Sequence, residues 1–159
     1  MKAYQVFARM SPELATELLE RIRESTPAAY TQALAAAGAV MKARPRFIMK
    51  LAPERRAQMV RRALARVAAS GLAEEILATY FLESRMELLT EWLDLLEIEH
   101  EEGSLKEEHP ECPPEAALAK AIETFRAAGP DDPDRDLLIE AFAAQSAVDW
   151  PVLDGLIGV

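Results

Sequence analysis

Apolar residues recur every three or four positions along most of this chain, the spacing by which an α-helix presents one face to a core. Leu14, Leu18 and Ile22 show the pattern first and predict a helix over residues 12–24. Further helices are predicted over residues 27–42, 53–69, 72–97, 114–128 and 133–146, with a short last helix from residue 151. No useful stretch alternates apolar and polar residues at period two. We therefore expect an all-α, compact single-domain bundle of six to eight helices without significant sheet.

Proline and cap residues indicate where these helices begin and end. Ser11 and Pro12 supply a hydroxyl N-cap and then a proline at the first helical position. Pro45 should end the second helix, because the residue before a proline disfavours helical geometry. For residues 46–51 we expect no more than a turn of helix. Ser84 starts a capping-box pattern, which predicts a break or kink within the longest predicted helix.

Residues 98–113 interrupt the helical pattern with Gly103, two prolines and many glutamates, and we expect an irregular acidic connection there. The candidate metal ligands lie in or beside it, within residues 97–112: Glu97, His100, His109 and Cys112. Glu97 and His100 have the spacing by which di-iron bundles present a carboxylate and an imidazole on one helix face. That chemistry needs a second such motif and two more carboxylates, so a solvated acidic loop is the favoured interpretation. The acidic surroundings of Cys112 should oppose thiolate formation, which argues against a nucleophilic role.

Length and composition restrict the class of protein. The 159 residues match the size of one domain, so we expect a single helical domain over residues 1–159. One cysteine excludes an intrachain disulfide and fits a reducing cytosol. The longest apolar run, residues 33–41, has 9 residues, whereas a membrane-spanning helix needs about 20. With no apolar leader after Met1, we expect a cytoplasmic protein that does not bind membranes.

The formal charge of -9 is distributed very unevenly. Residues 42–66 carry nine cations and a single acid, Glu54, whereas residues 67–159 have a net charge of -17. Arg55, Arg62 and Arg66 follow helical spacing and predict a basic stripe on one helix face. The candidate partner-binding residues are this stripe and three cations before it: Arg44, Arg46 and Lys50. Such asymmetry suggests a charged partner, or neutralisation of one part of the chain by the other.

The chain lacks the short sequence motifs that indicate common catalytic and cofactor-binding sites. It has no glycine-rich phosphate loop, no Gly-x-Ser-x-Gly, no His-Glu-x-x-His and no Cys-x-x-Cys. We therefore expect no cofactor and no catalytic residue, and favour a non-enzymatic protein.

The sequence alone leaves three possible functions. The favoured one is a protein–protein interaction, regulatory or adaptor protein whose partner is an acidic protein or a second copy of the chain in a homodimer. The first alternative is a nucleic-acid-associated regulator that uses the basic segment 42–66, although a sequence pI of 4.8 opposes polymer binding. The second alternative is a metal-dependent function at the acidic His/Cys loop 97–112.

Overall fold

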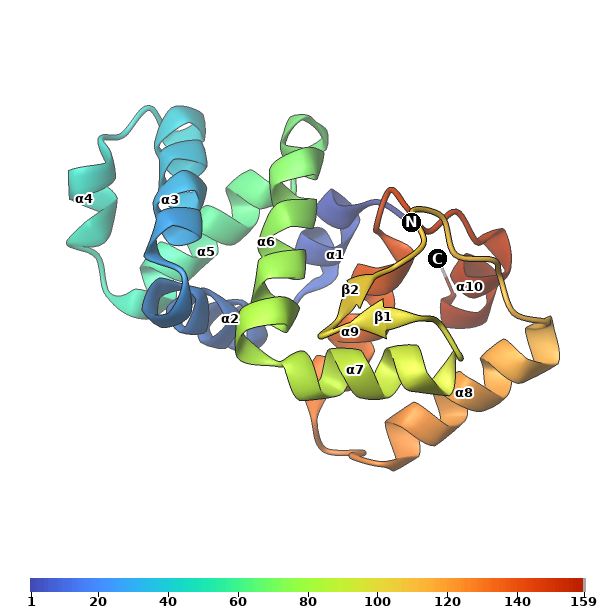
Figure 1. The fold of residues 1–159 in the computed structure, drawn as a ribbon. Coiled ribbons are helices and arrows are strands. Elements are labelled where there is room, and N and C mark those ends of the chain that lie inside the picture. The colour runs from blue at the N-terminus through green and yellow to red at the C-terminus, as the bar shows by residue number, and fades with distance from the viewer. Residues whose placement is uncertain (159) are drawn as a thin grey trace. The chain divides into compact units, whose positions relative to one another are not determined.

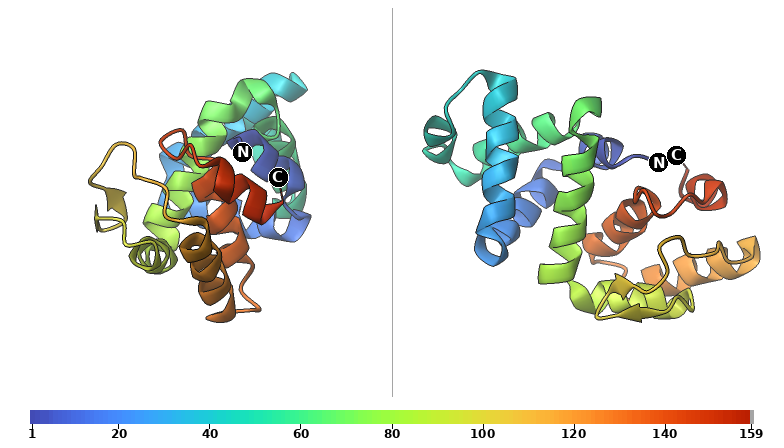
Figure 2. Two further views of the ribbon diagram at one scale, coloured as in Figure 1. Left: turned by 90° about the vertical axis from the view of Figure 1, so that its right-hand side faces the viewer. Right: turned by 45° about the horizontal axis from the view of Figure 1, so that its top comes forward.

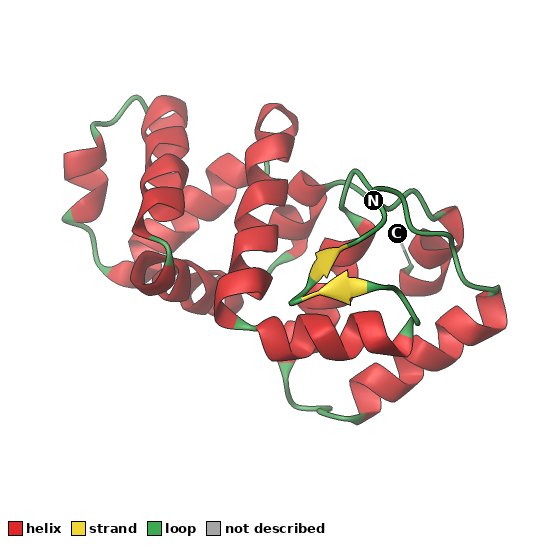
Figure 3. Cartoon of the chain, in the orientation of Figure 1, coloured by secondary structure: helices red, strands yellow, loops and turns green. Residues whose placement is uncertain are grey.

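A computed structural model describes residues 1–158 and is dominated by helix, with one very short pair of strands (Figure 3). The all-α class is therefore confirmed. Within the described residues there are ten α-helices, more than the six to eight expected. The difference has three sources: a helix before Met10 that the pattern did not predict, a complete helix at residues 45–49, and the break beside Ser84.

The chain packs as two compact units, which we call the N-terminal unit, Lys2–Ser84, and the C-terminal unit, Met1 together with the residues from Arg85 onward. That the whole chain behaves as a single domain, so that both units unfold together, stays a prediction. No helix among the described residues is long and apolar enough to cross a membrane.

The N-terminal unit is built only from helices, within the part of the chain that the structure describes (Figure 1). They are α1 (Ala3–Arg9), α2 (Pro12–Ser25), α3 (Pro27–Met41), α4 (Pro45–Met49), α5 (Pro53–Leu64), a 3₁₀ turn (Val67–Ala69) and α6 (Ser70–Ser84). Helix α2 packs against α3, α5 and α6, and α5 packs against α3. Leu18, Ile22, Val60 and Leu77 are fully buried between them. These side chains are the apolar stripe that helical spacing predicted.

Cap residues and a close backbone contact explain where α2 begins and how α3 ends before α4. Ser11 caps α2 as expected, its hydroxyl accepting the Leu14 N–H at 3.1 Å. Helix α3 ends at Lys42, which has the left-handed φ of 51°. A Cβ on Gly38 would lie 2.8 Å from the Ala43 carbonyl oxygen, and the Ala43 N–H donates to the Gly38 carbonyl at 3.0 Å. Only glycine permits this tight reversal, which turns the chain toward Pro45.

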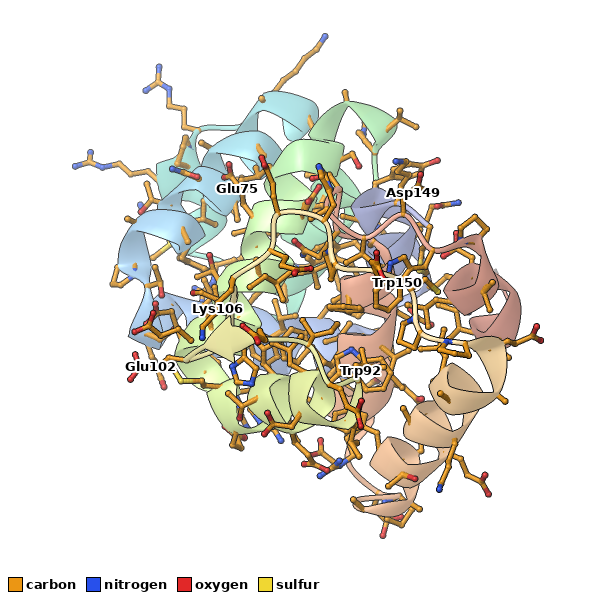
Figure 4. The ribbon with its side chains drawn as sticks, turned by 45° about the vertical axis from the view of Figure 1, so that its right-hand side comes forward. Glu75, Trp92, Glu102, Lys106, Asp149 and Trp150 are labelled. Atoms are coloured by element: carbon orange, nitrogen blue, oxygen red, sulfur yellow. The ribbon has the colours of Figure 1, made fainter. Side chains whose placement is uncertain are left out.

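The C-terminal unit surrounds a cluster of aromatic rings. Its elements are α7 (Met86–Leu95), β1 (His100–Glu101), β2 (Ser104–Leu105), α8 (Glu115–Ala127), α9 (Pro133–Ala143) and α10 (Pro151–Ile157). The Trp92 ring lies 5.3 Å from that of Phe125 and 6.0 Å from that of Phe142, which in turn lies 5.4 Å from that of Trp150. Figure 4 labels both tryptophans. The amino group of Met1 forms an ion pair with Asp154 on α10.

The expectation of an irregular connection over residues 98–113 is wrong for its first half. Strands β1 and β2 form an antiparallel hairpin that pairs His100 with Leu105. Glu102 and Gly103 have φ values of 49° and 83°, as a two-residue hairpin turn requires. Further along, Pro110 is buried, and its carbonyl accepts the Trp150 indole N–H at 3.0 Å. Residues 106–109 form the longest run of consecutive exposed residues in the segment.

Candidate protein-interaction surface

The cations of residues 42–66 separate into two groups with opposite environments. Seven of them are exposed, and we call them the basic surface: Lys42, Arg44, Arg46, Lys50, Arg55, Arg62 and Arg66. Within residues 1–158 none of the seven side chains forms a hydrogen bond or an ion pair. All six predicted partner-binding candidates belong to this group. Neutralisation of these side chains by the rest of the chain is therefore not seen in the described residues.

The other two cations, Arg56 and Arg61, turn inward from α5. Arg56 is only 4% exposed, and its guanidinium donates to Glu20 on α2 at 2.7 Å and to the Met49 carbonyl at 3.2 Å. Arg61 is half-buried and donates to the Met10 carbonyl at 3.0 Å. Arg56 therefore ties α5 to α2 and to the end of α4, and Arg61 ties α5 to the end of α1. The sequence pattern did not separate them from the basic surface.

The Arg56–Glu20 pair is maintained against the cost of burial. Burial alone would lower the pKa of Arg56 and raise the pKa of Glu20, because a low-dielectric environment disfavours both charges. The hydrogen bond and the Coulomb attraction between them outweigh burial, so the pKa of Arg56 is raised and the pKa of Glu20 is lowered. Both groups stay charged at neutral pH, and α5 remains tied to α2.

A groove between α4 and α5 lies within the basic surface. Helix α4 packs against α3 and stands at the edge of the unit, joined to its neighbours by loops (Figures 1 and 2). The hollow it leaves beside α5 has a volume of about 540 Å³ and is lined by Phe47, Leu51, Glu54, Arg55, Gln58, Met59 and Arg62. Apolar side chains therefore form much of its wall, with cations at its rim.

Helix α4 exposes apolar groups because five residues can bury only one side. Ile48 is its buried residue, whereas Phe47 is 58% and Met49 is 40% exposed. Met41, at the end of α3, is 45% exposed. Met41 and Met49 therefore lie largely outside the core. Val67, which falls within the helix predicted over residues 53–69, is 71% exposed because α5 ends at Leu64.

In the C-terminal unit, by contrast, most cations already have acidic partners. Arg85 donates to Asp132 at 2.7 Å and also pairs with the buried Asp134. Arg135 makes a two-point contact with Glu91, at 2.8 and 2.9 Å, and lies 4.6 Å from the centre of the Phe125 ring. These contacts are internal to one unit and have a structural role.

Burial alone would raise the pKa of Asp132, the N-cap residue of α9. The hydrogen bonds from Arg85 and from the Asp134 N–H oppose that effect, and the pKa of Asp132 is lowered. Burial alone would lower the pKa of Arg85, but hydrogen bonds to Asp132 and Glu87 raise it strongly. This ion pair therefore stays charged across the neutral range.

The predicted metal ligands are not brought together. Within residues 1–158 no group of three or more His, Cys, Asp or Glu side chains is arranged to hold a metal ion. His100 instead fixes the hairpin: its Nδ1 accepts the Gly103 N–H at 3.3 Å, and its Nε2 lies 3.0 Å from an Asp94 oxygen. Glu97 has a left-handed φ of 56°, just beyond the end of α7.

The two remaining candidates also have local contacts. His109 Nδ1 lies 3.3 Å from the Ala147 carbonyl. The Cys112 thiol donates to the Pro113 carbonyl at 3.4 Å. Desolvation raises the pKa of Cys112, and a raised pKa disfavours the thiolate that nucleophilic chemistry needs.

Comparisons of the chain with models of protein families, with curated proteins and with solved structures gave no match. The interpretation of the basic surface therefore depends on its own geometry.

Proposed function

We propose that this chain is a non-enzymatic regulatory or adaptor protein that works by binding another protein through the basic surface. One observation carries the proposal: the segment with seven exposed cations that have no side-chain partner among the described residues also holds an apolar groove, lined in part by Arg55 and Arg62, and the exposed Phe47 and Met49. Unpaired cations beside exposed apolar groups favour a partner that supplies both carboxylates and apolar side chains. A cytoplasmic location, consistent with the single cysteine, is part of this proposal.

Two alternative functions would use the same cations. A nucleic acid could bind them through its phosphates, and the exposed Arg55, Arg62 and Arg66 support that alternative. A second copy of the chain could bind them through the acidic residues of 67–159, giving a homodimer. The apolar lining of the groove favours a protein partner over phosphate, because phosphate contacts need no apolar wall.

The proposal is tested by replacing the three stripe arginines together with glutamine, R55Q/R62Q/R66Q. We expect poly-L-glutamate to bind the wild-type chain in a salt-dependent way and the triple variant weakly, with K120Q, an exposed cation on α8, as the matched control. Sedimentation of both proteins at two salt concentrations measures self-association. Equal binding of poly-L-glutamate by wild type and triple variant would contradict the proposal. Tighter binding of a short duplex DNA than of poly-L-glutamate would favour the nucleic-acid reading.

A further inference from the structure

We infer that the α4–α5 groove is the docking site for an acidic amphipathic helix of a partner protein. This inference rests on the proposed function and adds the chemistry of the partner to it. The partner helix would insert apolar side chains between Phe47 and Met59 and place carboxylates against Arg55 and Arg62.

The lining of the groove suits side chains rather than phosphates or a metal. Phe47, Leu51 and Met59 form the apolar part of a hollow of about 540 Å³, a volume within the range of sites that enclose small ligands. Methionine adapts its shape to different apolar contacts, and it recurs in grooves that accept helices. Phe47 is 58% exposed, so covering its ring would remove apolar surface from water.

The spacing of the rim cations favours a helical partner. Arg55 and Arg62 are seven positions apart on α5, which places them on one face and about 10.5 Å apart along the axis. A partner helix that lies along α5 would meet them with carboxylates at positions i and i+7. Its apolar residues, at i+3 and i+4, would then face the groove. The N-terminal unit offers no strand edge within its described residues, so strand addition is not available.

Charge complementarity identifies the partner as acidic. Residues 42–66 carry +8, and Arg56 and Arg61 use their charges internally, which leaves the seven cations of the basic surface against Glu54. A nucleic acid would satisfy the cations but would leave Phe47 and Met59 uncovered and place phosphates near Glu54. An acidic peptide with apolar residues satisfies both parts of the surface.

The test uses the full chain and fluorescein-labelled peptides of about 16 residues, roughly four turns of helix. The first peptide carries Glu at i and i+7 with Leu and Phe at i+3 and i+4. The second has the same residues in scrambled order, and the third keeps the charges but has Gln at the apolar positions. The protein variants are F47S for the lining and R55Q/R62Q for the rim. V67S and K120Q remove an exposed apolar group and an exposed cation outside the groove.

We expect the first peptide to bind at least about tenfold more tightly than the other two, and F47S to remove that advantage. R55Q/R62Q should weaken binding and flatten its salt dependence, while V67S and K120Q stay within about twofold of wild type. Equal binding of all three peptides would overturn the groove inference and leave the proposed function standing. Tighter binding of a peptide of residues 97–112 would overturn it in favour of a second copy of the chain. Tightest binding of duplex DNA, or no binding of any acidic probe, would overturn both.

Discussion

The buried Arg56 gives the sharpest test of how the basic surface is held in place. Replacing it with methionine keeps an unbranched apolar stem and removes the charge and its donors. The variant loses the 2.7 Å hydrogen bond to Glu20 and the 3.2 Å hydrogen bond to the Met49 carbonyl. A hydrogen bond to a charged group contributes about 1.5–3 kcal/mol. We expect R56M to lower the free energy of unfolding by about 2–3 kcal/mol, below the 3–5 kcal/mol of a fully buried broken pair.

We expect the smaller loss because one of the two groups, Glu20, stays partly in contact with water. The Glu20 side chain is 28% exposed, so water can solvate its carboxylate once Arg56 is gone. Chemical denaturation of R56M, E20Q and the double variant measures the coupling, which we expect to be about 1–2 kcal/mol. R55M, the exposed neighbour on α5, is the control and should change stability by less than about 0.5 kcal/mol.

The same variant tests whether Arg56 positions α4. Because Arg56 also donates to the Met49 carbonyl at the end of α4, amide hydrogens of residues 47–51 should exchange faster in R56M than in R55M. An R56M protein as stable as wild type, with zero coupling to E20Q, would refute the reasoning. It would mean that packing alone holds α4 and α5.

Three further predictions concern other parts of the molecule. The pKa of Asp132 is lowered in the folded chain. The stability that its carboxylate contributes is therefore complete above about pH 4 and is lost as the pH falls through the lowered, folded-state pKa. We expect D132N to be less stable than wild type at pH 7 and to lose less stability on acidification, as measured by denaturation from pH 7 to about pH 2. Replacing Arg55, Arg62 and Arg66 with glutamine should change stability by less than about 0.5 kcal/mol for each site in thermal melts, and a larger loss would make the stripe structural. In hydrogen exchange, residues 106–109 should be less protected than the Leu88–Leu93 core of α7, and equal protection would show a packed loop.

The sequence predicted the helical class and most of the helices because their apolar faces repeat over several turns. Helix α1 carries the same signal in Ala3, Val6 and Phe7, all buried, but seven residues are too few for periodicity to stand out. The hairpin was missed for a similar reason. Its strands are two residues long and depend on the contacts of His100, which no short-range pattern records.

The candidate surface was predicted in part. Arg55 and Arg62 lie on α5 and are exposed, as the predicted stripe requires, whereas Arg66 is exposed but has an extended backbone beyond the end of α5 at Leu64, so the predicted helical stripe is wrong for Arg66. Arg56 could not be distinguished from them, because its partner Glu20 lies 36 positions earlier and only the packing of α2 against α5 brings the two together. The groove could not be predicted either, since it depends on how α4 packs against α3 and on where that packing leaves α4 beside α5.

The central claim is that the basic surface and its groove form the binding site of this chain. Amide chemical shifts of the isotopically labelled protein, followed while the acidic amphipathic peptide is added, test it most directly. The account predicts progressive shifts confined to residues 41–66, with the amides of α8 unchanged and the shifts abolished by combining F47S with R55Q/R62Q. Shifts centred on other residues, or an unchanged spectrum at saturating peptide, would contradict it.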